Sequence, residues 1–520
     1  MKESNIPITP NPPINKTAKV SAIVPVGADG ALIEVEGAIA EGLPTFNLVG
    51  LASKTVNEAR ERVKNALKSA GFKFPLKRVT ISLAPAELNK DGPHLDLPIA
   101  LSVLILSGQL READIKDAIF VGELSLEGRL RPVRGIINIV EAAKKHGYKT
   151  VYLPKQNLNT ASLISDIEIY GVSTLSELFS HLKSQIHIAP ATSPAKKSPL
   201  GPLSAPTSPE LALSGIHGQP RVKRALAIAI AGRHNILLTG PPGAGKTALA
   251  RASAGLLPPL NQQEQIAVTK LHSLRSPQEE IITTPPFRSP HHTASPASII
   301  GSSNAANIFP GEISLAHKGI LFLDELPEFP RNVLESLRQP LEDGQVTISR
   351  ANQKITYPAD FMLIATMNPC PCGYLGEPNH RCSCTAAQIQ NYQKRISGPL
   401  LDRIDLYTEV HHESTKNLLS NPEVQVDQNA LAQSLKTAYA RQSLRHKRNA
   451  RLTAVDLREH ANLDRRAKNL LNTAADKLAL SARAYLKTLR VARTIADLED
   501  EDQIKQPHIS EALSFRKIEK

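Results

Sequence analysis

The sequence predicts an α/β protein with a mixed α+β region first, an α/β core on a parallel sheet second, and a helical region last. Residues 188–209 are dense in Pro, Ser and Ala and separate two regions that contain apolar runs. After this stretch, short apolar runs alternate with helical patterns, which is typical of buried parallel strands with crossover helices. From about residue 412 the strand-like runs disappear.

These observations divide the chain into five parts. We expect a flexible tail over 1–17, a first domain over 18–187, a linker over 188–209, an α/β core over 210–411 and a helical domain over 412–520.

The first domain combines strand-like runs with a helix. The runs SAIVPVG, ALIEVEGA and RVTISLAP favour strands. Thr55, with Glu58 three residues later, has the pattern of a capping box that begins a helix, and Gly71 is the expected stop. This region is therefore predicted to be mixed α and β.

Length, charge and cysteine content restrict the class of protein. A chain of 520 residues is too long for one compact core. No apolar stretch approaches the roughly 18 residues of a membrane span, and the first residues lack a secretory signal pattern, so we expect a cytoplasmic protein. With 62 Lys and Arg against 49 Asp and Glu, the net charge is +13, which favours a polyanionic partner. The absence of Trp argues against an aromatic base-stacking platform.

A phosphate-binding loop follows the first apolar run of the core. The segment GPPGAGKT matches G-x-x-x-x-G-K-[ST] between the strand-like NILLT and a helical pattern. Its backbone amides are expected to wrap phosphates, Lys246 to reach the terminal phosphates and Thr247 to bind Mg²⁺. The loop consists of Gly240, Pro241, Pro242, Gly243, Ala244, Gly245, Lys246 and Thr247.

Two further apolar runs end in polar residues suited to the same site. Asp324 and Glu325 follow GILFL, and we expect Asp324 to hold the Mg²⁺ and Glu325 to activate the attacking water. Asn368 follows FMLIATM and is placed to orient that water, although an Asn that closes a strand is often only a turn residue.

These motifs occur in the order typical of AAA+ ATPases, and the sequence resembles the magnesium-chelatase-like branch of that superfamily. Longer segments resemble the ComM/YifB family of competence-associated hexameric helicases. They are FRSPHHTAS, PGEISLAHKGILFLDELPEF, NPCPCGYLG, SGPLLDRIDL and VARTIADLE.

The resemblance implies roles for residues outside the three runs. Arg403 matches the arginine finger that reaches the nucleotide of a neighbouring subunit, and Arg483 matches the sensor-2 arginine of the lid. Gly218 and Gln219 match the segment near the adenine. For either arginine the alternative is an ordinary salt bridge.

Two basic features are candidates for DNA contact. Residues 346–357 have the pattern of a β-hairpin with a short turn, and by resemblance to AAA+ helicases Arg350 and Lys354 would face a central pore. Between residues 436 and 493 there are 15 Lys and Arg against 4 Asp and Glu. Both features have a simpler alternative, which is a solvated surface. From the basic run we select Arg445, Lys447 and Arg448 as DNA-binding candidates.

All four cysteines are clustered within fifteen residues, which excludes a scattered disulfide framework. The thiols of Cys370, Cys372, Cys382 and Cys384 could close a tetrahedral site for structural Zn²⁺. The C-x-C spacing is tighter than the usual chelate, and His380 is a competing ligand.

The first domain resembles the proteolytic domain of Lon proteases through KDGP, GELSLEGRLRPVRG and TVYLPKQN. By this resemblance His94 occupies the position of the nucleophilic serine and Ile139 that of the lysine base, so we predict a fold without peptidase activity. For Lys144 or Lys145 to act as the base, the helix would have to be rotated.

Together these interpretations favour an ATP-dependent homohexamer that moves along single-stranded, double-stranded or branched DNA and promotes branch migration during natural transformation, with recombination proteins as further partners. The alternative is a chelatase-type remodeller that acts on a protein partner.

Overall fold

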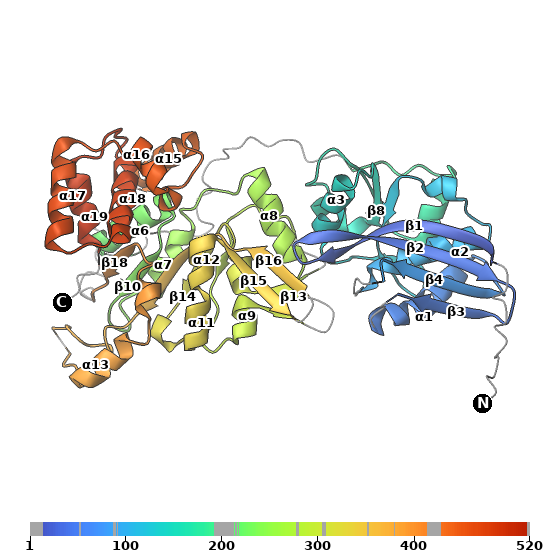
Figure 1. Ribbon diagram of the computed structural model, residues 1–520, viewed down its shortest axis with the longest axis horizontal. Coiled ribbons are helices and arrows are strands. Elements are labelled where there is room, and N and C mark those ends of the chain that lie inside the picture. Colours follow the sequence, from blue (N-terminus) through green and yellow to red (C-terminus); the bar gives the residue numbers. More distant parts are fainter. Residues whose placement is uncertain are drawn as a thin grey trace, which may run out of the picture.

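The structure is a computed structural model with two lobes, the N-terminal region and the α/β core with its C-terminal helices (Figure 1). It describes residues 14–50, 54–86, 90, 92–191, 213, 216, 218–276, 280–303, 308–350, 353–378, 380–412 and 428–516. Most of the predicted linker lies outside these residues. The predicted tail overlaps a strand at 14–17, because the first strand begins at Ile14 and pairs along its length with the second.

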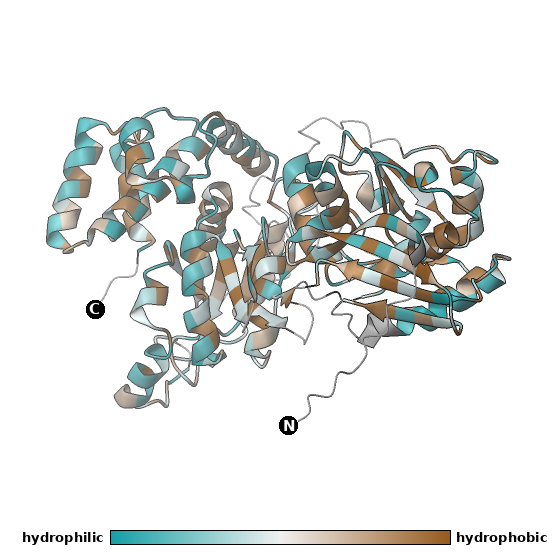
Figure 2. Ribbon diagram, turned by 45° about the vertical axis from the view of Figure 1, so that its right-hand side comes forward, coloured by the Kyte–Doolittle hydropathy of each residue, from teal (hydrophilic) through white to brown (hydrophobic). Residues whose placement is uncertain are grey.

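The N-terminal region contains a four-stranded and a three-stranded sheet. The larger has the order β1-β2-β4-β3, in which only β3 and β4 run parallel, and the smaller has the parallel order β5-β8-β9. Their bounds are β1 (Ile14–Val26), β2 (Asp29–Ala40), β3 (Thr45–Val49), β4 (Arg78–Ala84), β5 (Ala118–Phe120), β8 (Thr150–Pro154) and β9 (Glu168–Val172), with a small hairpin of β6 (Glu123–Leu124) and β7 (Leu130–Arg131). Alternating hydropathy stripes these strands in Figure 2, as expected of sheets with one buried face.

Five helices pack on these sheets. They are α1 (Lys54–Ser69), α2 (Asp96–Leu106), α3 (Ile136–Lys145), α4 (Leu158–Ala161) and α5 (Leu175–Leu182). The predicted helix is α1. It begins one residue before Thr55, so this residue lies in its first turn and not at the cap. Gly71 ends the helix as predicted, with φ +83° and an amide that donates to the Lys68 carbonyl at 3.0 Å.

The core is a parallel sheet of the order β11-β14-β17-β10-β18. Three of its strands were predicted from the apolar runs. The bounds are β10 (Ile236–Thr239), β11 (Phe287–Arg288), β14 (Ile320–Leu323), β17 (Met362–Met367) and β18 (Leu406–Glu409). Both faces are buried: Ile236 and Leu238 of β10 pack on one side, and Leu237 packs on the other. Apolar runs without alternation are the sequence signature of such strands.

Helices and short strands surround this sheet. The helices are α6 (Pro220–Gly232), α7 (Lys246–Ala254), α8 (Gln262–Ser273), α9 (Pro296–Ile300), α10 (Glu312–Leu315), α11 (Arg331–Ser336), α12 (Arg338–Asp343), α13 (Ala386–Gln393) and α14 (Gly398–Leu401). Two antiparallel pairs complete the core, β12 (Gly301–Ser303) with β13 (Ile308–Pro310) and β15 (Gln345–Arg350) with β16 (Gln353–Pro358). The second pair is the predicted hairpin.

The described part of the C-terminal region is helical, as predicted. It comprises α15 (Gln428–Leu444), α16 (Ala454–His460), α17 (Arg465–Lys477), α18 (Ala482–Leu498) and α19 (Gln506–Ser514). These helices share one hydrophobic core with α6, α7 and one face of the parallel sheet. The helical part is therefore packed as a continuation of the α/β core.

The N-terminal region contacts the core at α8 and at the hairpin, as Figure 1 shows. A Cβ atom on Gly27, in the turn between β1 and β2, would lie 2.4 Å from Ile355 of β16. The Gly135 amide donates to the Ser273 carbonyl at 2.9 Å, and Lys270 of α8 forms an ion pair with Glu141 of α3. The turn between β1 and β2 therefore packs against the hairpin, and α3 packs against α8.

Candidate functional site

The phosphate loop leaves β10 and enters α7 at the carboxyl edge of the parallel sheet. Gly243 and Gly245 have φ values of +79° and +83°, a conformation that side chains rarely adopt. A Cβ atom on Gly240 would lie 2.2 Å from the Val410 carbonyl oxygen, so this position admits only glycine. Nothing lies within 4 Å of a Cβ on Gly245 among the described residues, which leaves room for a phosphate at the helix N-terminus.

Lys246 connects this loop to the end of β17. Its Nζ donates to the carbonyl oxygens of Gly240 and Pro241, both at 2.7 Å, and to Oδ1 of Asn368 at 3.0 Å. Burial lowers the pKa of Lys246, and the charges of Asp324 and Glu325 act in the opposite direction. The lysine and the polar residue that closes β17 thus meet, although 122 positions separate them.

Thr247 and Asp324 form the second contact of the site. The Thr247 hydroxyl donates to one carboxylate oxygen of Asp324 at 2.9 Å, and the Thr366 hydroxyl donates to the other at 2.5 Å. A hydroxyl beside a carboxylate is the oxygen donor set that Mg²⁺ uses in phosphate sites, so these residues fit the predicted ion.

Thr366 is a site residue that the sequence analysis missed. Besides holding Asp324, its hydroxyl accepts a hydrogen bond from the Glu325 amide at 2.9 Å. Glu325 has φ +53° and an exposed side chain, so the strand turns sharply where it ends and presents this carboxylate outward. The available signal in the sequence was a hydroxyl residue within the apolar run FMLIATM. The structure buries this residue fully.

Gly218 and Gln219 lie beside the phosphate loop. Both have positive φ, +63° and +55°, in the turn that begins α6. The Gln219 side chain donates to the His411 carbonyl at 2.5 Å. The neighbouring Val410 packs against Gly240 of the phosphate loop, and contact of this turn with a nucleotide base stays a prediction.

The two predicted arginines lie at the amino edge of the sheet, where the parallel strands begin. Arg403 precedes β18, and its carbonyl accepts a hydrogen bond from Asn235, which precedes β10. Arg403 forms an ion pair with Glu342, and Arg483 lies 3.3 Å from the same carboxylate. A four-residue strand spans about 13 Å, so neither arginine is placed to reach the phosphate loop of its own chain.

A cavity of about 290 Å³ opens at this amino edge. Its lining contains more cations than carboxylates. The cations are Arg233, Arg403, Arg448, Arg451, Arg483, Lys487 and Arg490, and the carboxylates are Glu342, Asp360 and Asp405. Such a cavity suits a strongly anionic group supplied from outside the chain.

The hairpin places one of its two predicted DNA contacts on the surface. Lys354 is exposed on β16, where it pairs with Ser349 of β15. Arg350 ends β15, but its side chain and the turn at 351–352 lie outside the described residues.

Several cations of the basic run in the helical part are bound to carboxylates of their own chain. Arg445 donates to Asp497 at 2.5 Å, Lys447 to Asp456 at 2.8 Å, and Arg448 lies 5.0 Å from the centre of the Tyr439 ring. Arg441 forms ion pairs with Asp500 and Asp502. Carboxylates of the segment 497–502, directly after the counted window, therefore hold Arg441 and Arg445.

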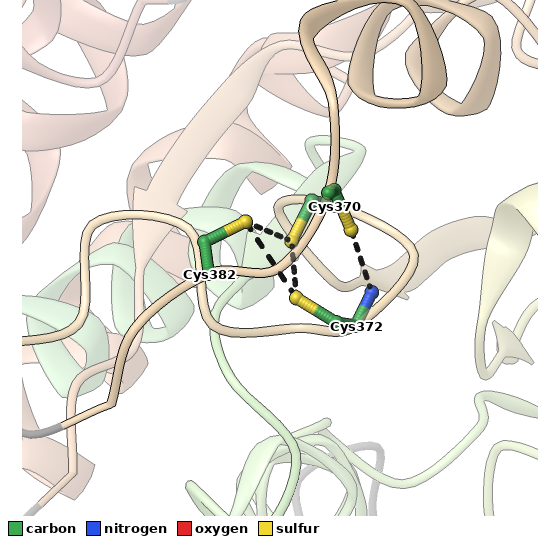
Figure 3. Close-up of side chains that lie close together, drawn as sticks. Cys370, Cys372 and Cys382 are labelled. Carbon is green, nitrogen blue, oxygen red and sulfur yellow. Dashed lines mark hydrogen bonds between the residues drawn. The ribbon is translucent and has the colours of Figure 1, made fainter.

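The four cysteines form one cluster next to the nucleotide residues. All four sulfur atoms lie within 4.8 Å of one another. Those of Cys370, Cys372 and Cys382 are 3.4 to 3.7 Å apart and point toward one another (Figure 3). His380 lies outside this cluster, with its ring 4.8 Å from that of Tyr374.

Family models match three segments of the chain. Residues 212–418 match magnesium chelatase, subunit ChlI; residues 35–157 match subunit ChlI of Mg-chelatase; and residues 426–516 match the C-terminal part of that subunit. The sequence is 43% identical over 496 residues to competence protein ComM of Haemophilus influenzae, covering 94% of this chain and 96% of that protein. The chain belongs to the ComM/YifB family.

Other relatives agree with this assignment. The YifB protein of Salmonella typhimurium is 40% identical over 498 residues. These cover 95% of this chain and 96% of that protein. The Lon protease of Rhizobium meliloti is 28% identical over 182 residues, or 32% of this chain and 22% of the protease. The resemblance to both groups is thereby confirmed, together with a mixed α/β fold that has a parallel sheet and C-terminal helices.

In the Lon-like part of the chain, His94 and Ile139 stand where the resemblance places the nucleophile and the base. His94 Nε2 lies 3.0 Å from the Arg134 carbonyl, and Ile139 is fully buried in an apolar cluster. Lys144 forms an ion pair with Asp166 at 2.9 Å, and Lys145 lies 3.6 Å from Asp29. Both lysines are therefore engaged on the surface, and the absence of peptidase activity stays a prediction.

Within the described residues, we find no helix that combines the length and apolar character needed to cross a membrane.

Proposed function

We propose that this protein is an ATPase whose hydrolysis of ATP to ADP and phosphate drives a homohexamer along DNA and promotes branch migration of recombination intermediates during natural transformation. The observation that carries the proposal is the set of contacts at the carboxyl edge. Lys246 reaches Asn368, and Thr247 reaches Asp324, so three strands contribute to one phosphate-binding site.

Each residue of this set has a defined task in hydrolysis. Lys246 exchanges its backbone acceptors for the more strongly attracting terminal phosphates, while the loop amides hold the rest of the triphosphate. Glu325 accepts a proton from the attacking water, and Asn368 orients that water. When bound, Mg²⁺ neutralises charge on the phosphates, and Thr247 and Asp324 are the residues that would hold it.

The arginines supply the argument for an oligomer. Arg403 and Arg483 lie at the opposite edge of the sheet from the phosphate loop of their own chain, and both face one cation-rich cavity. A neighbouring subunit that brings its nucleotide to this cavity would gain two fixed cations for the phosphoryl oxygens. In this arrangement the site is incomplete in a single subunit.

The hairpin and the relatives support DNA as the substrate of the motor. Lys354 is exposed on the hairpin. Contacts between lysine side chains and DNA phosphates give affinity without sequence preference. The similarity to a protein named for competence agrees with a role in taking up and recombining DNA. The proposal also includes a zinc ion bound by the four cysteines, because their sulfur atoms all lie within 4.8 Å of one another.

The test is ATP-dependent unwinding of forked DNA and of three-stranded branched DNA by the purified protein. We expect the wild-type protein to unwind both and Lys246→Ala to unwind neither. A wild-type protein that hydrolyses ATP but leaves both substrates intact would contradict the motor proposal.

The magnesium-chelatase models favour a second candidate, a remodeller that acts on a protein partner. The rate of ATP hydrolysis with and without DNA separates the two. Stimulation by DNA of any sequence supports the motor, whereas a rate that responds only to a protein partner supports the remodeller.

A further inference from the structure

We propose that the four-cysteine cluster is a metal site that controls the nucleotide site, because its loop lies directly on the phosphate loop. The inference rests on the proposed ATPase activity but not on DNA as the substrate. The ion it takes is of the class that four thiolates select, with Zn²⁺ as the first candidate.

The sulfur positions match one tetrahedral ion. Zn–S bonds of about 2.3 Å in a tetrahedron place the sulfurs about 3.8 Å from one another. The measured separations of 3.4 Å, 3.7 Å and 3.6 Å within the triad of Cys370, Cys372 and Cys382 are close to this value. Cys384 completes the set, and its sulfur accepts a hydrogen bond from the Cys372 amide at 3.4 Å. All four are free thiols, so no disulfide competes for these sulfurs.

One side of the cluster is attached to the nucleotide residues. Cys370 is fully buried and follows two positions after Asn368, whose side chain receives the hydrogen bond from Lys246. The next turn is closed by the Gly373 amide, which donates to the Cys370 carbonyl at 3.0 Å. A Cβ atom on Gly373 would lie 2.5 Å from Cδ of Pro242, so this turn rests on the phosphate loop.

The other side of the cluster is attached to α13. Cys384 directly precedes Thr385, which caps this helix. At the C-terminal end of α13, Gln393 donates to the Pro369 carbonyl at 3.1 Å. The neighbouring Tyr392 is buried in the hydrophobic cluster that contains Leu237 of β10. An ion bound by both C-x-C pairs therefore joins α13 to the turn that follows Asn368 and packs against the phosphate loop.

This connection predicts how loss of the metal would act. Without the ion, the turn that carries Gly373 is held only by the chain and by a few hydrogen bonds. The turn would then no longer pack tightly against Pro242. The position of Asn368 would no longer be fixed by a metal ligand two residues later, at Cys370. We expect weaker nucleotide binding and slower hydrolysis, since misplacing a site by about 1 Å can cost about a hundredfold in rate.

The first experiment measures metal content and nucleotide affinity in the full-length protein without DNA. We expect one zinc per chain by elemental analysis, loss of that zinc in a Cys382→Ser, Cys384→Ser double variant, and at least about tenfold weaker binding of a fluorescent ATP analogue. Protein from which a chelator has removed zinc should show the same weak binding and regain affinity when zinc is returned. This reversal also distinguishes lost metal from failure of the variant to fold.

A glycine pair tests the contact without touching the ligands. Gly373→Ala should keep its zinc and weaken nucleotide binding. Gly376→Ala is the matched control, because Gly376 has nearly the same φ of +85° but no neighbour within 4 Å of a Cβ in the described part of the chain. We expect this control to bind both zinc and nucleotide normally.

The outcomes separate this inference from the motor proposal. Protein that binds no zinc, or whose nucleotide affinity is the same with and without zinc, overturns the control of the site by metal. Normal metal-dependent nucleotide binding in a protein that fails to move on DNA leaves the inference standing and refutes only the motor.

Discussion

The two edges of the parallel sheet carry different groups of predicted site residues. At the carboxyl edge, Lys246, Thr247 and Asp324 already contact partners that could hold and orient a nucleotide. At the amino edge, Arg403 and Arg483 are held by Glu342, a carboxylate of their own chain. The phosphate loop therefore has its polar groups assembled locally, whereas the predicted role of the arginines requires a nucleotide from another subunit.

This difference follows from the parallel arrangement of the strands. Their carboxyl ends meet at one edge, which gathers residues that follow each strand, while residues that precede each strand gather at the other. In the ring that we propose, the amino edge of one subunit would lie against the carboxyl edge of the next, which would bring both sets of residues to one phosphate.

The largest effect is expected at the amino edge. Replacing Arg403 with Ala should lower the ATPase rate by about a thousandfold, the usual loss when an arginine finger is removed. Mixing this variant with Lys246→Ala should restore some activity, because some interfaces then combine an intact phosphate loop with an intact arginine. No recovery over a range of mixing ratios would place Arg403 in its own subunit's site.

A smaller effect is expected at the carboxyl edge. Thr366→Val removes the hydroxyl that binds Asp324 and the Glu325 amide, and a hydrogen bond to a charged group contributes about 1.5–3 kcal/mol. We expect a higher Mg²⁺ requirement for ATP hydrolysis, measured by titration with Mg²⁺.

The matched control for Thr366→Val is Thr408→Val on the neighbouring part of the sheet. Thr408 is also buried, but its hydroxyl has no hydrogen-bond partner within the described chain. An equal change in the Mg²⁺ requirement for both variants would mean that the effect is only general packing.

Releasing the arginines should have a milder effect. Glu342→Gln removes the charge that competes with an incoming phosphate, and partly exposed ion pairs contribute about 0.2–1 kcal/mol. We expect ATPase activity to reach its half-maximum at a lower protein concentration, by about two- to fivefold. Glu335→Gln, which breaks the partly exposed pair with Arg338, is the control and should leave this concentration unchanged.

A separate prediction concerns acid stability at the amino edge. Burial lowers the pKa of His317 to about 4, and its Nδ1 accepts a hydrogen bond from the Asp360 amide at 3.1 Å. Since an unfolded histidine titrates near 6.5, only the unfolded chain binds this proton between those values, and stability falls as pH falls through that window. His317→Asn keeps an acceptor that does not titrate, so its melting temperature should decline less between pH 6.5 and 4.

Local sequence patterns determined the residues of the phosphate loop and some of the elements of this protein. Apolar runs of four to six residues predicted β10, β14 and β17, because strands buried on both faces need no alternation. The residues that close these strands, such as Asp324 and Asn368, could be assigned because parallel strands must end together. The two C-x-C pairs were equally visible, since their ligands are close in the chain.

Only the tertiary structure decided which distant groups meet. The pairing of Arg445 with Asp497 crosses 52 positions, and that of Arg403 with Glu342 crosses 61. Charge counts along the chain treat such residues as separate, so they could not show which cations of the basic run form ion pairs within the chain. The contact of Gly373 with Pro242 is likewise absent from any local pattern, because it depends on how two loops close over one edge of the sheet.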